Sequence, residues 1–336
     1  MKHRRMGRTG LKVSEICLGT MTFGVQCDQK ASFAILDKAA AEGLDFIDTA
    51  DVYPIPIKLE SVGRTEEILG RWLKGSRDRF VVASKCFFPM GEGPRERGNS
   101  RRHVLASIEA SLRRLKTDYI DLYQVHAYDA ETPLEETLRA LDDATRAGKI
   151  RYAGCSNFLA WEMAKAVAAA DALGLEGFTC TQPRYNALHR DVELDLLPLC
   201  ADRGIGVIVF NPLAGGLLTG KHAPGKPPAK GTRFSEELEE SATVYKKRYW
   251  QEEALTAVAN LNDFFKKRDK SLATAAIAWV LRRPELSAAI VGASKPAQLD
   301  ATLKASDVTL GEEEVAALDA LWFDLPRRRP ATGPVR

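Results

Sequence analysis

The chain has 336 residues, of which 45% are hydrophobic and 28% charged, and its formal net charge is +3. This composition is ordinary for a globular protein, and so small a charge gives no reason to expect a nucleic-acid or membrane partner. The length fits either two ordinary domains or one large α/β barrel with insertions.

Strand-like apolar runs and helical stretches alternate along most of the chain. In chain order the strand-like runs are EICLGT, LDFIDT, RFVVASK, DYIDLYQVH, IRYAGCSN, FTCTQPRYN, IGVIVFNP and LSAAIVGAS, and a helical stretch follows each. This alternation predicts a parallel sheet with right-handed crossovers, and eight units in this length predict a closed (β/α)8 TIM barrel. The rival fold, a doubly wound open sheet, would carry GxGxxG after an early strand, and the sequence has no such motif.

Three pieces fall outside the repeat. RRMGRTGLKVS near the start predicts a β-hairpin with Thr9-Gly10 as its turn, placed to plug the bottom of the barrel. The segment 223–250 predicts a long loop after the seventh strand that passes into a charged helix. We therefore expect one barrel domain over residues 1–325 and a basic, flexible tail over residues 326–336.

The location of the protein is predicted from its cysteines and its first residues. The six cysteines are scattered without a CxxC pair, which is typical of reduced core residues rather than of a disulfide framework. MKHRRMGRTG lacks the apolar segment of a secretory signal, and no apolar run approaches the length that spans a bilayer. We expect a cytoplasmic protein.

Residues suited to chemistry follow several of the predicted strands. In a barrel of this kind the active site lies at the carboxyl ends of the strands. The second, third and fourth strands would deliver Asp48 with Tyr53 just beyond it, then Lys85, then His126. The later strands would bring mostly small or polar residues to the same face, namely Ser156, Asn157, Gln182, Tyr185, Asn186, Asn211, Gly292, Ser294 and Lys295.

Each of these residues also has an ordinary structural interpretation. An aspartate after a strand is commonly a turn residue, and Asp51 fits that role. The joint arrival of a phenol, an ammonium, a carboxylate and an imidazole at neighbouring strand ends favours chemistry instead. A nearby ammonium lowers the pKa of a phenol, and Asp48 could balance the charge of a buried Lys85. Together with His126 these groups would make a proton donor for an oxygen that gains negative charge, such as a carbonyl that receives hydride.

With these residues in place, the sequence resembles the aldo-keto reductases along nearly its whole length. The matching motifs, in order, are GLKVSEICLGTMTFG, LDFIDTADVY, EEILGRWL, VVASK, NSRRHVLASIEASLRRLKTDYIDLYQVHAYD, GKIRYAGCSNF, QPRYN, PLAGGLLTGK and VGASKPAQL. The last two are most similar to the branch of bacterial reductases that includes the potassium-channel β subunits.

The resemblance implies a barrel that binds NADP(H) or NAD(H), with Asp48, Tyr53, Lys85 and His126 as the family tetrad. Tyr53 would be the general acid, Lys85 would tune it with Asp48 behind, and His126 would orient the carbonyl. The implied cofactor-binding residues fall into three groups, for the nicotinamide, the pyrophosphate and the adenosine end. They are Ser156, Asn157, Gln182 and a stacking Tyr185; the loop from Asn211 to Lys221 with Leu213, Gly215 and Leu217; and Gly292, Ser294, Lys295 and Gln298.

The sequence departs from the family pattern near the adenosine end. Family members often carry arginine at position 294 and a Glu-Asn pair where Ala301-Thr302 stand here, and they commonly have serine in place of Asn211. Lys295, with Lys221 or Arg233, could instead neutralise a 2′-phosphate. We therefore expect NADP(H) to be preferred, with NAD(H) possible.

Two other kinds of site are disfavoured. GGLLTGKH nearly matches a P-loop, but His222 occupies the position of the hydroxyl that would bind Mg²⁺. The five histidines show no HxH or HExxH spacing, so we expect no metal.

The favoured function is reversible reduction of an aldehyde or ketone by NAD(P)H. The alternative is an NADP(H)-binding regulatory subunit with slow turnover, like the channel-associated relatives. The sequence identifies neither the carbonyl substrate nor the oligomeric state.

Overall fold

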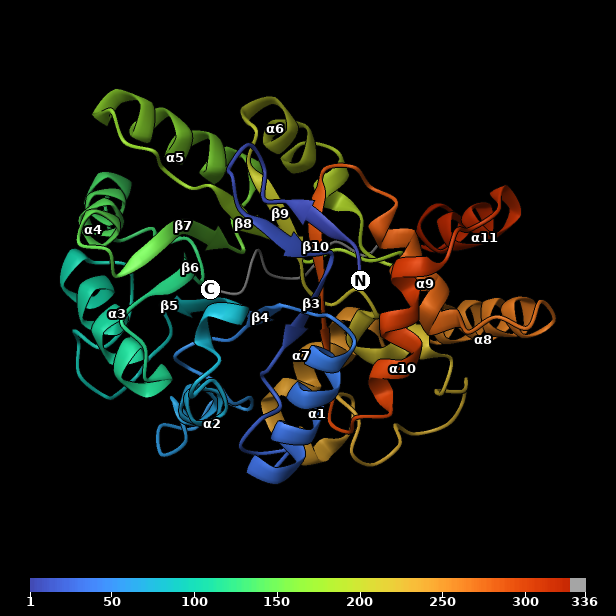
Figure 1. Cartoon of the computed structure of the whole chain (residues 1–336). Helices are drawn as coiled ribbons and strands as arrows, with labels where there is room; N and C mark the ends of the chain where they lie inside the picture. The colour runs from blue at the N-terminus through green and yellow to red at the C-terminus, as the bar shows by residue number, and fades with distance from the viewer. Residues whose placement is uncertain (327–336) are drawn as a thin grey trace.

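The computed structural model describes residues 1–326, apart from the side chain of Glu240, and its centre is a closed barrel of eight parallel strands (Figure 1). The predicted (β/α)8 barrel is confirmed. Of the expected tail over residues 326–336, all but Pro326 lies outside the described residues. The barrel strands, in pairing order, are β3 (Ile16–Gly19), β4 (Phe46–Asp48), β5 (Val81–Cys86), β6 (Ile120–Val125), β7 (Ile150–Ser156), β8 (Cys180–Gln182), β9 (Gly206–Val209) and β10 (Leu286–Gly292), which pairs with β3.

Helices surround the barrel and cover the outer faces of its strands (Figure 1). Some begin at a residue whose side chain caps the first turn: those of Asp28 and Ser100 accept hydrogen bonds from free N–H groups of α1 and α3. Two further helices, α8 (Glu252–Lys266) and α11 (Glu312–Phe323), pack outside α9 (Leu272–Leu281). The other covering helices are α1 (Gln29–Ala41), α2 (Arg64–Trp72), α3 (Arg101–Leu115), α4 (Leu134–Arg146), α5 (Ala160–Leu173), α6 (Leu196–Arg203) and α10 (Gln298–Leu303).

The predicted N-terminal hairpin closes the bottom of the barrel. It consists of β1 (His3–Arg5) and β2 (Lys12–Ser14), and the fully buried side chains of Met6 and Val13 join the apolar cluster inside the barrel. The turn was expected at Thr9-Gly10 but lies earlier, where the N–H of Thr9 binds the carbonyl of Met6. Gly7 has φ +54°, and a Cβ there would lie 2.4 Å from the backbone of Gly204. Close approach to the barrel floor therefore sets the turn.

Side chains inside the barrel form an apolar layer beneath a polar one. Because successive side chains on a strand point to opposite faces, residues two apart share a face. Phe46, Ala83, Leu122 and Cys180 belong to the interior apolar cluster. Two residues further along the same four strands lie the buried polar residues Asp48, Lys85, Gln124 and Gln182. The barrel thus holds its polar groups at the carboxyl ends of the strands.

The long connection after β9 is folded and lies next to the loop that follows β4. It contains the 3₁₀ segments η3 (Ala214–Thr219) and η4 (Glu236–Leu238) and the helix α7 (Glu239–Tyr249), which agrees with the predicted loop and charged helix. Lys58, in the loop after β4, forms an ion pair with Glu239 at 3.2 Å. The short 3₁₀ segments elsewhere are η1 (Arg77–Arg79), η2 (Asp191–Glu193) and η5 (Lys304–Asp307).

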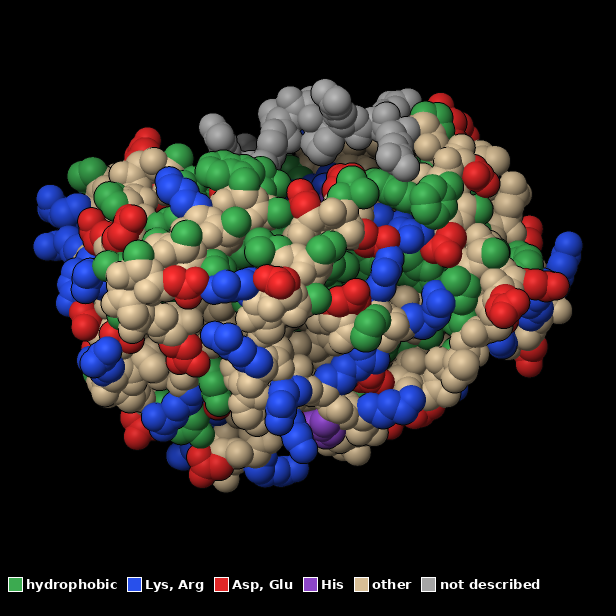
Figure 2. All heavy atoms as spheres, turned by 90° about the horizontal axis from the view of Figure 1, so that it is seen from above, with side chains coloured by type: hydrophobic (Ala, Val, Ile, Leu, Met, Phe, Trp, Pro, Cys, Tyr) green, Lys and Arg blue, Asp and Glu red, His purple; other side chains and the backbone are tan. Residues whose placement is uncertain are grey.

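Charged side chains of both signs are interspersed over the face seen in Figure 2, in keeping with the small net charge. Within residues 1–326, no helix combines the length and the apolar character needed to cross a membrane. All six cysteines are buried and free, as the sequence predicts.

Candidate active site

The centre of the polar layer is an ion pair between Lys85 on β5 and Asp48 on β4. The Nζ atom of Lys85 lies 2.5 Å from Oδ1 of Asp48 and 2.7 Å from the carbonyl oxygen of Thr49, and the lysine is fully buried. The other carboxylate oxygen of Asp48 accepts a hydrogen bond of 2.9 Å from Gln182. Burial disfavours the ammonium, but the charge and hydrogen bond of Asp48, together with the nearby Tyr53, outweigh burial, so the pKa of Lys85 is raised. Lys85 is therefore a fixed positive charge.

Tyr53 is held beside this pair by the loop that follows β4. The N–H of Asp51 binds the carbonyl of Lys85 at 3.0 Å, and the N–H of Tyr53 binds the carbonyl of Ala50 at 3.2 Å. These bonds leave Nζ of Lys85 5.2 Å from the centroid of the Tyr53 ring. Burial raises the pKa of Tyr53, and Lys85 acts in the opposite direction without cancelling it. The expected lowering by Lys85 is present, but the net shift is upward, because the phenolate would be desolvated.

His126 follows β6 and completes the group. Its ring centroid lies 5.9 Å from that of Tyr53 and 4.9 Å from that of Phe88, with edge-to-face geometry in both cases. The backbone carbonyl of His126 accepts a hydrogen bond of 2.9 Å from the side chain of Asn157. Burial, aided by the charge of Lys85, holds the pKa of His126 well below its usual value, so the imidazole is neutral. Its Nδ1 atom is buried and has no partner among the described residues.

Asp51 faces a different buried polar group, outside the barrel. Both of its carboxylate oxygens lack hydrogen-bond partners among the described residues, and the side chain is fully buried. Nearby, the buried Glu66 on α2 accepts hydrogen bonds from Ser84 at 2.5 Å and Arg114 at 2.7 Å. Burial, reinforced by the charge of Glu66, raises the pKa of Asp51 well above its usual value. Asp51 is thus separate from the group of Asp48, Tyr53, Lys85 and His126, and among the described residues its carboxylate makes none of the hydrogen bonds by which an aspartate shapes a turn.

The residues expected to bind the carboxamide lie at the carboxyl ends of two neighbouring strands, β7 and β8. The hydroxyl of Ser156 donates to the carbonyl of Gln182 at 2.9 Å, and the side chain of Asn157 contacts that hydroxyl at 3.1 Å. Asn157 has φ +58°, a conformation that asparagine tolerates better than most residues. The amide nitrogen of Gln182 is already bound to Asp48, so this residue joins the tetrad to the expected cofactor site.

Tyr185 does not fit the stacking role expected for it. It is fully buried in the outer core, its ring stacks on Trp279 with centroids 5.4 Å apart, and its hydroxyl lies 2.5 Å from Glu193. Alternation explains the error, because Gln182 points inward and a residue three positions later points outward. Phe210, which follows β9, is only partly buried and packs against the apolar cluster inside the barrel. Phe210 is therefore better placed than Tyr185 for the stacking role. Sequence analysis missed it, although the same alternation counted from Ile208 would have found it.

The loop after β9 gathers unpaired positive charge around a glycine-rich turn. Gly215 and Gly216 both have positive φ, 70° and 102°, which brings backbone groups to the surface of the turn. Arg233 donates to the side chains of Asn211 at 3.1 Å and Tyr245 at 3.0 Å. Burial lowers the pKa of Lys221, and the nearby Arg233 lowers it further. Neither Lys221 nor Arg233 forms an ion pair with a side chain that the structure describes, so the turn suits a phosphate.

Other expected cofactor residues are placed as follows. The side chain of Leu217 is fully buried, so only its backbone could meet a ligand, whereas Leu213 is partly exposed. A Cβ on Gly292 would lie 3.1 Å from the Arg233 guanidinium, which puts the end of β10 beside the same charge. The side-chain oxygen of Gln298 accepts a hydrogen bond of 2.7 Å from the N–H of Ser294, and Lys295 is exposed next to them.

The buried amide of Asn211 tests the fit to a dinucleotide. Its Nδ2 atom has no partner among the described residues, although its Oδ1 atom binds Arg233. An unpaired buried donor next to two unpaired cations is costly without an anionic or carbonyl ligand. The residues present therefore fit the pyrophosphate of a nicotinamide dinucleotide. By contrast, no group of His, Cys, Asp or Glu side chains in the described ranges could hold a metal ion.

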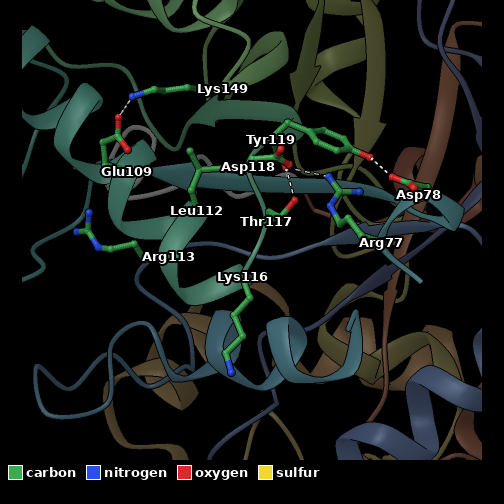
Figure 3. A pocket seen from close by; sticks show the side chains of 10 residues that line it. All are labelled: Arg77, Asp78, Glu109, Leu112, Arg113, Lys116, Thr117, Asp118, Tyr119 and Lys149. Atoms are coloured by element: carbon green, nitrogen blue, oxygen red, sulfur yellow. Dashed lines mark hydrogen bonds and ion pairs between the residues drawn. The ribbon is translucent and has the colours of Figure 1, made fainter. Parts of the chain in front are cut away.

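A surface hollow of about 720 Å³ lies at the opposite end of the barrel (Figure 3). Its walls come from the segments before β5, β6 and β7 and from the end of α3. Some of its lining groups have partners: Arg77 pairs with Asp121 at 2.6 Å, the hydroxyl of Tyr119 donates to Asp78 at 3.0 Å, and Lys149 pairs with Glu109. Because the hollow lies at the end of the barrel away from Tyr53 and Lys85, we assign it no chemistry.

Comparison with known proteins agrees with this geometry. The model of the aldo/keto reductase family matches residues 15–322. The "Uncharacterized oxidoreductase YrpG" of Bacillus subtilis (strain 168) is 37% identical over 329 residues, 96% of each chain. A "Probable voltage-gated potassium channel subunit beta" of Oryza sativa subsp. japonica is 37% identical over 334 residues, 98% of each chain. The "L-glyceraldehyde 3-phosphate reductase" of Escherichia coli O157:H7 is 33% identical over 326 residues, 95% of this chain and 92% of the relative. The chain therefore belongs to the aldo/keto reductase family.

Proposed function

We propose that the protein reversibly reduces an aldehyde or a ketone to the alcohol, with NADPH as the hydride source and Tyr53 as the proton donor. Membership of the family makes the chain a carbonyl-reducing oxidoreductase in general terms, and the family commonly binds nicotinamide cofactors. The observation that carries the finer proposal is the buried group in which Lys85 lies 2.5 Å from Asp48 and 5.2 Å from the centroid of the Tyr53 ring, with the centroid of the His126 ring 5.9 Å from that of Tyr53.

The charges of this group suit proton donation to a carbonyl oxygen. A bound nicotinamide would supply hydride to the carbonyl carbon. Tyr53 remains protonated near neutral pH because burial raises its pKa, so it has a proton to give. The Lys85 ammonium stabilises the phenolate that is left, and Asp48 keeps that ammonium charged and in place. The neutral imidazole of His126 can donate a hydrogen bond to the same oxygen and orient it.

The expected catalytic roles are tested by the Tyr53→Phe variant. Loss of a general acid lowers turnover by roughly 100- to 10,000-fold, whereas the ring and its packing are retained. We expect NADPH affinity, measured by fluorescence titration, to be unchanged. Tyr119→Phe is a matched control, because that hydroxyl lies in the hollow at the other end of the barrel. Near wild-type turnover by Tyr53→Phe would refute the proposal.

NADP(H) is the proposed cofactor, in preference to NAD(H). Two unpaired cations, Lys221 and Arg233, and the exposed Lys295 support this, because an added phosphate would meet positive charge. Steady-state kinetics with NADPH and NADH should give a lower KM for NADPH. A clear preference for NADH ends this part of the proposal. The buried, reduced cysteines support a cytoplasmic location, which fractionation of cells would test.

Similarity to the plant channel subunits favours one alternative, a regulatory subunit that binds NADP(H) and turns over slowly. The two functions differ in what a screen would find. A reductase turns over at least one carbonyl compound in a broad panel, whereas a regulatory subunit shows negligible turnover and co-purifies with a membrane partner. The intact tetrad makes the enzyme the favoured function.

A further inference from the structure

A second positively charged group lies at the mouth of the barrel, next to the expected nicotinamide site. Arg184 comes two residues after Gln182, so it points to the same, inward side. It forms a parallel bridge with Phe210, which packs against the interior cluster. Arg184 therefore stands above Gln182 at the open end of the barrel.

The last turn of α7 is docked onto this position. The Arg184 guanidinium lies 5.9 Å from the centroid of the Tyr249 ring. The side chain of Asn186 donates to the hydroxyl of Tyr249 at 3.1 Å and to the carbonyl of Asn211 at 2.9 Å. These contacts place Arg248, the neighbour of Tyr249, beside Arg184. An Nη atom of Arg184 also lies 3.4 Å from Nδ1 of His189.

The positive charge of this group is not balanced within the described part of the chain. Neither Arg184 nor Arg248 forms an ion pair with a carboxylate that the structure describes. Burial lowers the pKa of Arg248, and repulsion from Arg184 adds to this; burial and the two arginines also lower the pKa of His189 to about 3. Among the described residues, the carboxylate within ion-pair distance of this group is that of the largely exposed Asp191, 3.5 Å from Nδ1 of His189.

A neighbouring arginine shows what pairing looks like here. Arg190 binds Glu193 at 2.8 Å and Asp319 at 2.5 Å. Arg184 and Arg248 are both half-buried, lack such partners among the described residues, and lie close enough for their charges to repel. An anion between them would relieve that repulsion. Guanidinium groups bind carboxylate and phosphate oxygens through paired N–H donors.

We propose that Arg184, Arg248 and His189 form an anion-binding subsite that receives the carboxylate or phosphate group of the carbonyl substrate. The subsite is offset by about one helical turn from the group of Lys221 and Arg233. Tyr245 of α7 contacts Arg233, whereas the Arg184 guanidinium lies over the ring of Tyr249 in the last turn of the helix. The inference rests on the proposed function, and it names the class of substrate: an aldehyde or ketone that bears an anionic group.

The test compares substrates that differ only in this group. Butanal is paired with 4-oxobutanoate, and glyceraldehyde with glyceraldehyde 3-phosphate, with NADPH in all assays. The wild type should prefer the anionic member of at least one pair, and which pair shows the preference tells carboxylate from phosphate. Arg184→Gln and Arg248→Gln should lower kcat/KM for that anionic member by about 10- to 100-fold, mainly through KM, because each removes a charge-assisted hydrogen bond. The neutral member should change less than about threefold.

Two further variants check that the effect is local. Arg248→Lys keeps the charge and should retain much of the preference. Arg203→Gln removes an arginine that is paired with Asp171 on the outer helices, and it should behave as wild type. Thermal denaturation of each variant establishes that it is folded.

Several outcomes overturn the proposal. One is equal kcat/KM for both members of each pair in the wild type, and another is an equal loss of kcat/KM for both members in the variants. A third is a loss of NADPH affinity in Arg184→Gln with no change in substrate preference, which would make the group a cofactor site. If no carbonyl compound is turned over, calorimetric titration with succinate and inorganic phosphate decides. If the wild type binds one of these anions and Arg184→Gln does not, the anion subsite stands although the proposed reductase activity is refuted. If the wild type binds neither anion, the subsite itself is overturned.

Discussion

Removing either member of the Lys85–Asp48 pair should destabilise the fold far more than removing both. Lys85→Met leaves the Asp48 carboxylate buried with only amide donors, from Gln182 at 2.9 Å and Gln124 at 3.5 Å. Asp48→Asn leaves a fully buried ammonium whose remaining close partner is the carbonyl of Thr49 at 2.7 Å. The double variant leaves two neutral side chains of similar size.

The size of the effect follows from burial. Breaking a buried ion pair from one side costs about 3 to 5 kcal/mol, because the remaining charge is uncompensated, whereas replacing both members by neutral groups costs much less. The double variant should therefore lose less stability than either single variant. The double-mutant cycle then gives a coupling energy of at least about 3 kcal/mol, at the upper end of the range for residues in contact.

Urea unfolding, followed by circular dichroism at pH 7, measures these free energies. The exposed pair Arg146–Asp142 on α4 is the control, and Arg146→Met there should cost less than about 0.5 kcal/mol. The reasoning is refuted if Lys85→Met costs less than about 1 kcal/mol, or if the two single effects add in the double variant. Either result would mean that the polar layer is open to water.

Three other predictions concern single side chains. The pKa of Asp51 is raised in the folded state, so wild-type stability falls as the pH rises from about 4, where the unfolded carboxyl ionises, towards that raised value. In urea unfolding, Asp51→Asn should therefore be more stable than the wild type by on the order of 1 to 3 kcal/mol at pH 7, but not at pH 3. A stability difference that does not change with pH would contradict this. Phe210→Ala should weaken NADPH binding about tenfold in a fluorescence titration. Tyr185→Phe should leave NADPH binding unchanged and lower stability by about 1 to 2 kcal/mol. Weaker NADPH binding in Tyr185→Phe but not in Phe210→Ala would restore Tyr185 to the cofactor site. His126 has a lowered pKa, so kcat/KM should stay level across the pH range around 6.5, and a step there that His126→Gln removes would show a charged imidazole.

Much of the barrel could be predicted from the sequence, because each parallel strand is buried on both faces and reads as a continuous apolar run. The same feature hides which face of a strand points inward. For Asp48, Lys85 and His126 the family motifs supplied the answer. For Tyr185 and Phe210, position relative to a strand end was not enough, and only the alternation visible in the structure separates the outer core from the interior.

Charge balance was the other feature that the sequence did not reveal. The sequence does not distinguish among the three arginines Arg184, Arg190 and Arg248. Of these three, only Arg190 has carboxylate partners among the residues that the structure describes. The burial of Asp51 without a hydrogen-bond partner in that same part of the chain was hidden in the same way, since it depends on α2 and α3 covering the loop after β4. Pairing between distant segments decides both cases.

The hairpin seal at the floor of the barrel restricts how ligands reach the buried polar layer. With Met6 and Val13 filling that end, the described residues leave the layer accessible from the carboxyl ends of the strands. If the protein is the reductase proposed above, a nicotinamide ring bound deepest in this mouth would have to enter before the carbonyl compound and leave after it. A sealed floor would therefore favour ordered binding and release.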